Sequence, residues 1–256
     1  MERTPAAAPR TAVVWAVLRR ELERRADPLM IVDVGGGTGG FAVPLARAGH
    51  RVTVIDASPD ALAALIRRAA EAGVGDLVTA AQGDADAIAD LVEPDSADLV
   101  LCHSLLEVVD EPTDVVKALA AALRPGGAAS VLVANRAAAV LARAITGHLT
   151  SAMALLADAQ GGDPPGGRPR DTLRRRYDAA SAAALLEAAG LAVEEIHGVR
   201  VVADLVPGTV ADADPQALLA FELAVAGLAP YRDMATALHL LARHPGVERR
   251  PLPAAA

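Results

Sequence analysis

A glycine-rich segment with an acid on either side is the part of this chain best suited to bind a ligand. The apolar run 30–34 contains Asp33 and is followed by glycines from Gly35 to Gly40, and a second apolar run ends in Asp56. Glycine lets the backbone turn sharply and approach a ligand closely. An acid about 20 residues after such a loop is placed to accept hydrogen bonds from ribose hydroxyls. The pattern predicts a site for an adenosine-containing cofactor.

Two kinds of cofactor fit this glycine loop (residues 35–40). Gly35, Gly37 and Gly40 have the spacing G-x-G-x-x-G of dinucleotide-binding folds. The pattern D-x-G-x-G-x-G, which begins at Asp33 and ends at Gly39, is instead the first motif of class I S-adenosylmethionine (SAM) methyltransferases. A carboxylate at Asp33 would repel a pyrophosphate at the following helix N-terminus but would attract the ammonium of a methionine moiety. The loop therefore favours SAM, with a dinucleotide or a purely structural turn as alternatives.

The composition predicts a soluble, cytoplasmic protein. The chain has 256 residues, 53% of them hydrophobic, and a formal net charge of −8. This charge argues against a surface that coats nucleic acid generally, although a local basic patch lies at residues 168–176. The single cysteine, Cys102, excludes an intramolecular disulfide. We find no signal peptide, membrane span or metal-ligand spacing, so we expect no membrane association and no metal.

Hydrophobic patterning predicts strands alternating with helices. Such an order is typical of a doubly wound α/β sheet with right-handed crossovers. We predict a Rossmann-like, mostly parallel seven-stranded sheet with a helical insertion after the fifth strand. The predicted strands are residues 30–34, 51–56, 77–81, 97–103, 128–134, 191–205 and the end of 230–243, and the predicted helices include 10–26, 40–48, 59–72, 113–123, 181–190 and 215–227.

The same patterning predicts one SAM-binding domain over residues 1–256. Within it, residues 137–180 form an insertion that is expected to cover the substrate, with a helix over 137–156. Residues 245–256 read as a disordered tail.

Polar side chains stand at the ends of the predicted parallel strands, where ligands of such sheets bind. Asp33, Asp56, Asp84 and His103 occupy these ends. We predict that Asp33 contacts an ammonium, that Asp56 binds a ribose and that Asp84 approaches an adenine amino group. His103 is either a cofactor contact or a hydrogen-bonded core residue. It becomes the leading general base if the methyl acceptor is a hydroxyl or an amine.

These motifs together resemble class I SAM-dependent methyltransferases, and more specifically the bacterial tRNA 5-carboxymethoxyuridine methyltransferases. The resemblance spans most of the chain from Arg10 onward. It implies that Arg10 binds the methionine carboxylate, that Gly35 and Gly36 line the cofactor through their backbones, and that Ala85 lies near the adenine. The segments that carry it are 10–15, 33–39, 83–85, 103–108, 124–127, 186–190, 198–201, 230–231 and His239.

The predicted site has a cofactor part and an acceptor part. The cofactor-binding set is Arg10, Asp33, Gly35, Gly36, Gly37, Asp56, Ala57, Asp84, Ala85 and His103, and His103 is also the catalytic candidate. The acceptor-binding set is Asn135 and Arg136, which follow the fifth strand, and Arg200, whose planar guanidinium suits a carboxylate or a phosphate.

The predicted reaction is direct transfer of the SAM methyl group. The favoured acceptor is a carboxylate oxygen, which is ionised at pH 7 and needs no base. It belongs either to a modified tRNA wobble uridine or to a small acidic metabolite, and a small-molecule O- or N-methyltransferase is the alternative. An NAD-dependent oxidoreductase is the rival enzyme class. It lacks support because this chain has no Tyr-x-x-x-Lys pair, since Lys117 is its only lysine. A SAM-binding module without catalysis also stays open, as does the choice between monomer and homodimer.

Overall fold

One mostly parallel sheet organises the part of the chain that the computed structural model describes, residues 10–25, 27–157 and 175–246. The strand order among these residues is β3-β2-β1-β4-β5-β7-β6, and β7 runs antiparallel to both of its neighbours while the other pairs are parallel. The seven-stranded fold expected from the sequence is thereby confirmed. The strands are β1 (Met30–Val34), β2 (Arg51–Asp56), β3 (Val78–Gln82), β4 (Ala97–His103), β5 (Leu123–Ala134), β6 (Ala192–Val199) and β7 (Ala237–Arg243).

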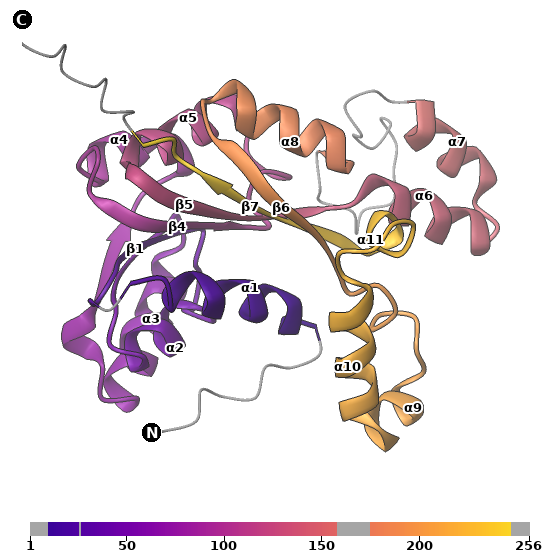
Figure 1. The fold of residues 1–256 in the computed structure, drawn as a ribbon, viewed down its shortest axis with the longest axis horizontal. Helices are drawn as coiled ribbons and strands as arrows, with labels where there is room; N and C mark the ends of the chain where they lie inside the picture. Colours follow the sequence, from indigo (N-terminus) through magenta and orange to yellow (C-terminus); the bar gives the residue numbers. More distant parts are fainter. Residues whose placement is uncertain (1–9, 26, 158–174, 247–256) are drawn as a thin grey trace, which may run out of the picture.

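Helices cover both faces of the sheet (Figure 1). One face packs against α1, α2 and α3, and the other against α5 and α8. Residues of the central strand β4 alternate between these two cores, with Leu99 and Leu101 on the first side and Val100 and Cys102 on the second. The helices are α1 (Ala12–Leu22), α2 (Ala42–Arg47), α3 (Pro59–Glu71), α4 (Ile88–Leu91), α5 (Pro112–Ala122), α6 (Arg136–Ile145), α7 (Leu149–Ala157), α8 (Ala179–Ala188), α9 (Gly208–Ala213), α10 (Pro215–Val225) and α11 (Tyr231–Met234).

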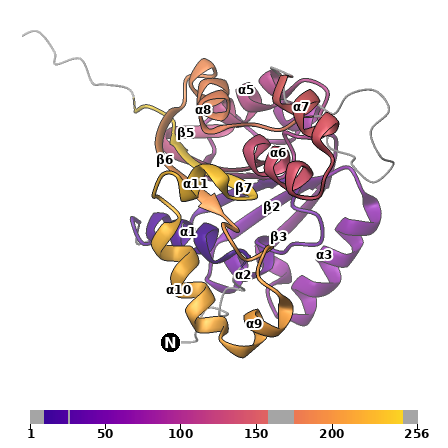
Figure 2. The same cartoon turned by 90° about the vertical axis from the view of Figure 1, so that its right-hand side faces the viewer.

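The carboxyl ends of the parallel strands open toward one end of the molecule. The additional helices α6, α7, α9, α10 and α11 gather at that end (Figure 2), and α6 contacts α11. None of the described helices is both long and apolar enough to cross a membrane.

Three predicted elements differ from those observed. The single helix expected over 137–156 is two helices, because Gly147 has φ of +81° and separates α6 from α7. The sixth strand ends at Val199 rather than residue 205, since Arg200 has φ of +61° and turns the chain out of the sheet. The fifth strand begins at Leu123, where a pairing with Ala97 precedes the regular ladder.

Parts of the predicted insertion and tail lie outside the described residues. These are residues 158–174, which include most of the basic patch, and residues 247–256.

A charge network fastens the antiparallel edge of the sheet to α1. The guanidinium of Arg243 donates two hydrogen bonds to Glu21, at 2.8 and 2.9 Å, and two to Glu194, at 2.8 and 2.7 Å. At Glu21 burial raises the pKa, but hydrogen bonds and attraction from Arg243 and Arg24 together lower it below its usual value. At Glu194 a hydrogen bond from Arg243 is the main cause of a lowered pKa. One arginine therefore joins α1, β6 and β7.

We expect the substitution Arg243→Met to lower the free energy of unfolding by about 2–4 kcal/mol at pH 7, because it leaves the carboxylates of Glu21 and Glu194 with only Arg24, among the described residues, as an ion-pair partner. A carboxyl whose pKa is lowered by folding stabilises the protein above its unfolded pKa of about 4.5 and loses this effect as the pH falls through the folded pKa. The cost of the substitution should therefore shrink toward pH 3. Urea unfolding at both pH values tests this, with exposed Arg47→Met as the matched control. Equal stability of the Arg243 variant and the wild type at pH 7 would contradict it.

Candidate active site

The glycine loop turns away from the end of β1 by a backbone path that only glycine follows without strain. Gly35, Gly37 and Gly39 have φ values of +72°, +55° and +79°. At Gly36 the reason is space, since a Cβ there would lie 2.5 Å from Oδ2 of Asp33. At Gly36 the loop therefore has no side chain between its backbone and the Asp33 carboxylate.

The Asp56 carboxylate is fixed in position at the end of β2. The backbone N–H of Gly37 donates to its Oδ2 at 2.8 Å, and that of Ser58 donates to its Oδ1 at 2.9 Å. A carboxylate oxygen can accept more than one hydrogen bond. Asp56 therefore has acceptor capacity left for a diol, as a ribose ligand requires.

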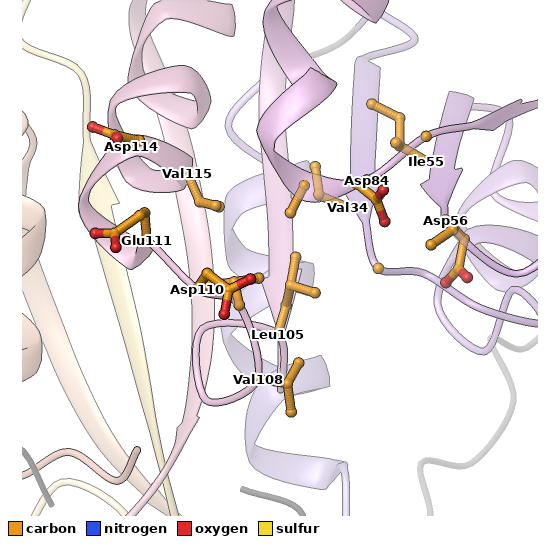
Figure 3. A pocket seen from close by; sticks show the side chains of 15 residues that line it. Val34, Ile55, Asp56, Asp84, Leu105, Val108, Asp110, Glu111, Asp114 and Val115 are labelled. Carbon is orange, nitrogen blue, oxygen red and sulfur yellow. The ribbon is translucent and has the colours of Figure 1, made fainter. Parts of the chain in front are cut away.

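A cavity of about 600 Å³ opens beside this carboxylate. Pockets of this size hold small organic ligands and cofactors. Figure 3 shows Asp56 and Asp84 on one side of the cavity and Asp110, Glu111 and Asp114 on the other. The lining consists of Val34, Gly35, Ile55, Asp56, Ala57, Gly83, Asp84, Ala85, Leu105, Val108, Val109, Asp110, Glu111, Asp114 and Val115.

Half of the predicted cofactor-binding set lines this cavity. These members are Gly35, Asp56, Ala57, Asp84 and Ala85, which come from three different strand ends. The other predicted members, Arg10, Asp33, Gly36, Gly37 and His103, are not among the lining residues. Their roles toward a cofactor stay predictions.

Asp33 is a buried carboxyl group behind the glycine loop. Only 3% of the residue is exposed, and its Oδ2 has no hydrogen-bond partner among the described residues. Burial, together with repulsion from Asp56, raises the pKa of Asp33 to about 7. A cationic group beside Asp33 would remove both penalties, as the predicted contact with an ammonium requires.

His103 ends β4 and takes part in a buried hydrogen-bonded chain. Its Nε2 lies 2.9 Å from the hydroxyl of Ser130, which lies 2.7 Å from Nε2 of His239. Its ring packs edge-on against Phe41, with 4.7 Å between the centroids. Burial lowers the pKa of His103 to about 4, so its imidazole is neutral at pH 7. The Ser130 hydroxyl carries one hydrogen, so it donates to one histidine and accepts from the other.

The structure brings Arg10 and Arg200 to one acid. Nε of Arg10 lies 3.2 Å from Oδ1 of Asp204, and Nε of Arg200 lies 3.5 Å from its Oδ2. The prediction from sequence gives the two arginines different partners, the methionine carboxylate of the cofactor for Arg10 and a carboxylate or phosphate of the acceptor for Arg200. It contains no role for Asp204.

The two other predicted acceptor contacts have partners within the protein. Asn135 is 2% exposed, caps α6 through its side-chain oxygen, and donates from Nδ2 to the carbonyls of Asp233 and Ala235. Its amide nitrogen therefore holds the segment that contains α11, and the predicted contact of Asn135 with an acceptor stays a prediction. The guanidinium of Arg136 forms an ion pair with Asp178, and 23% of the arginine side chain is exposed.

The segment after the insertion is tied to the loop that lines the cavity. Arg175 donates to the carbonyls of Val109 and Asp110, and Tyr177 donates to the carbonyl of Leu106 at 3.1 Å. The described end of the predicted insertion therefore contacts the wall of the cavity directly. Arg175 has a structural role in these contacts.

Sequence reasoning missed the acids of the 105–115 wall and the Ser130–His239 pair. A local signal existed for the wall, because Asp110 and Glu111 directly precede the Pro112 that begins α5. A serine in the apolar strand β5 was a weaker signal. Its pairing with His239 depends on a register between strands 109 residues apart, which no local pattern reveals.

Known proteins resemble most of the chain. A family model described as a methyltransferase domain matches residues 9–196. A tRNA 5-carboxymethoxyuridine methyltransferase of Escherichia coli (strain K12) is 30% identical over 240 residues, covering 92% of this chain and 88% of that protein. A ubiquinone biosynthesis O-methyltransferase of Xanthomonas euvesicatoria pv. vesicatoria (strain 85-10) is 35% identical over 117 residues, covering 46% of this chain and 48% of that protein. The solved structure of an S-adenosylmethionine dependent methyltransferase from Mesorhizobium loti shares the fold, with a TM-score of 0.58 at 22% identity over 90% of this chain and 97% of that one.

Proposed function

The chain belongs to the SAM-dependent methyltransferases, and we propose that it methylates a carboxylate oxygen of a modified wobble uridine in tRNA. The observation that supports this acceptor is the length of the sequence similarity to one relative. The similarity to the tRNA 5-carboxymethoxyuridine methyltransferase covers 92% of this chain, whereas the similarity to the ubiquinone O-methyltransferase covers 46%. A match across nearly the whole chain includes the elements outside the cofactor half, which favours the tRNA acceptor over a small molecule.

The cofactor is SAM, as the glycine loop favours over a dinucleotide. Two carboxyl groups suit SAM: Asp33, which lies behind the glycine loop, and Asp56, which lines the cavity. The Asp33 carboxyl lacks a partner for Oδ2, which the ammonium of the methionine part would supply. The Asp56 carboxylate is held by two backbone N–H groups at the place where a ribose diol would be bound. We propose that Asp84 and Ala85 meet the adenine at the same wall.

The chemistry asks little of the protein beyond positioning. When bound, SAM would supply a methyl group on a positively charged sulfur. The acceptor oxygen would take this methyl group, and the electron pair of the broken carbon–sulfur bond would stay on sulfur. No proton moves, because the acceptor carboxylate is already ionised. Burial lowers the pKa of His103, so its imidazole is a weak base, and this transfer does not require one. Holding oxygen, carbon and sulfur in line is then the main contribution of the site.

Transfer of radioactive methyl groups from SAM tests the acceptor. We expect label to enter tRNA that carries the free carboxymethoxy group and not the same tRNA transcribed without modifications. The labelled product should be an ester, so mild alkali should release the label as methanol. Label that resists alkali, or no label in the modified tRNA, would refute the tRNA carboxylate as acceptor. Small acidic metabolites, assayed in parallel with the same protein, test the alternative of a small-molecule acceptor.

A further inference from the structure

The segment that follows β6 is held rigidly although it contains no regular structure. The side chain of Glu222 in α10 is fully buried and accepts three backbone hydrogen bonds from this segment, from Val201, Val202 and Ala203, at 2.8–2.9 Å. Thr236 also donates, from its backbone N–H and its hydroxyl, to the carbonyl of Arg200. These contacts fix the carbonyl of Arg200 and the backbone of the three residues that follow it.

Arg200 itself is held in an unusual conformation. Its φ of +61° lies in the left-handed region, which a residue with a branched or long side chain rarely adopts. Such strain persists where the surroundings over-determine the backbone, and it is concentrated at ligand sites. Here the surroundings are the Glu222 and Thr236 contacts. The consequence is that Arg200 and Asp204, one helical turn apart in sequence, are presented side by side.

The Asp204 carboxylate lies between two guanidinium groups from distant parts of the chain. Each of its oxygens faces a different arginine, Oδ1 facing Arg10 near the start of α1 and Oδ2 facing Arg200 after β6. Arg10 keeps 68% of its side chain exposed and Arg200 keeps 31%, whereas Asp204 keeps 26%. Both arginines can therefore meet a group from solvent without a rearrangement of the core.

A guanidinium pair around one carboxylate is a carboxylate-binding site by its own chemistry, because arginine donors match the two oxygens of that group. We propose that Arg10 and Arg200 form one carboxylate site that Asp204 fills in this structure, and that a ligand carboxylate displaces Asp204 on binding. Asp204 is thus an internal competitor that the ligand must replace. The ligand carboxylate belongs either to the methionine part of the cofactor or to the methyl acceptor, and the second case rests on the proposed function.

Removal of the competitor should strengthen ligand binding. We expect Asp204→Asn to tighten binding of the carboxylate ligand by about 2- to 25-fold, because two partly exposed ion pairs, each of which contributes little, must be broken in the wild type. Asp212→Asn is the matched control, since it removes the same charge from an exposed position in the neighbouring helix α9. Asp204→Ser serves as a second variant should Asp204→Asn fail to fold.

Calorimetry and kinetics then separate the two sources of the carboxylate. Tighter binding of S-adenosylhomocysteine, with unchanged binding of 5′-methylthioadenosine, which lacks the aminocarboxyl group, identifies the cofactor carboxylate. An unchanged cofactor affinity with a lower KM for the modified tRNA identifies the acceptor carboxylate. Unchanged or weaker binding in both experiments overturns the proposal, as does an equal gain in Asp212→Asn. Because the calorimetric experiment needs no acceptor, failure of the tRNA assignment and failure of this site are read separately.

Discussion

Substitution of Asp56 by alanine is expected to weaken SAM binding about 100-fold, because a carboxylate that accepts two ribose hydroxyl hydrogen bonds contributes roughly 1.5–3 kcal/mol through such charged contacts. The carboxylate is already oriented by the N–H groups of Gly37 and Ser58, so little ordering is needed when a ribose binds. Calorimetric titration with SAM measures the change. The same loss should appear with 5′-methylthioadenosine, because that molecule keeps the ribose.

Asp76→Ala provides the control for this experiment. Asp76 is an exposed acid in the short turn before β3 and does not line the cavity. A thermal unfolding transition in the Asp56 variant shows whether the fold is kept, because the substitution also removes the acceptors for Gly37 and Ser58. A folded Asp56→Ala protein with wild-type affinity for SAM would falsify the assignment of Asp56 as the ribose ligand.

Asp33→Asn is expected to stabilise the protein and to weaken SAM binding at the same time. Folding raises the pKa of Asp33 from 3.8 to about 7, so ionised Asp33 costs stability that grows between about pH 4 and pH 7 and stays constant above. A shift of this size corresponds to about 4 kcal/mol. We expect a gain of about 1–3 kcal/mol in the free energy of unfolding at pH 8, less than the full cost because the buried amide that replaces the carboxyl is also desolvated.

The binding half of this prediction concerns the methionine ammonium. Loss of the charge should weaken SAM and S-adenosylhomocysteine about 10- to 100-fold, the range for a hydrogen bond between charged groups, and should spare 5′-methylthioadenosine. Wild-type affinity for SAM should also rise from pH 6 to pH 8, as Asp33 gives up its proton to pair with the ammonium, and this rise should vanish in Asp33→Asn. Denaturant unfolding and calorimetry at both pH values measure the two effects. A variant less stable than the wild type at pH 8, or one with unchanged affinity for SAM, contradicts the account of Asp33.

The cofactor half of the fold could be predicted because its signals are local. The strands that end in Asp56 and His103 have the predicted bounds, as does the one that holds Asp33, and Ser58 caps α3 as its sequence indicates. Each of these elements is specified by an apolar run next to a capping or turning residue. Because these strand ends are specified locally, the predicted cofactor-binding residues Asp56, Ala57 and Asp84 do lie beside one cavity.

The remainder could not be predicted because it depends on distant partners. The end of β6 at Val199 is set by Glu222, whose carboxylate takes the backbone donors of the residues that follow. From sequence, Asn135 is predicted to be a polar residue at the rim of the acceptor site, yet its side-chain amide donates hydrogen bonds to carbonyls about 100 residues away. The meeting of Arg10 with Asp204 likewise joins opposite ends of the chain. No pattern within a window of sequence contains these pairs.

The most direct measurement is a crystal structure of the protein with S-adenosylhomocysteine bound. The expected density places the ribose hydroxyls within hydrogen-bond distance of the Asp56 carboxylate, the adenine beside Asp84 and Ala85, and the ammonium beside Asp33. A ligand bound elsewhere, or one whose ribose does not touch Asp56, would contradict the central claim that the cavity at the ends of β1 and β2 is the cofactor site.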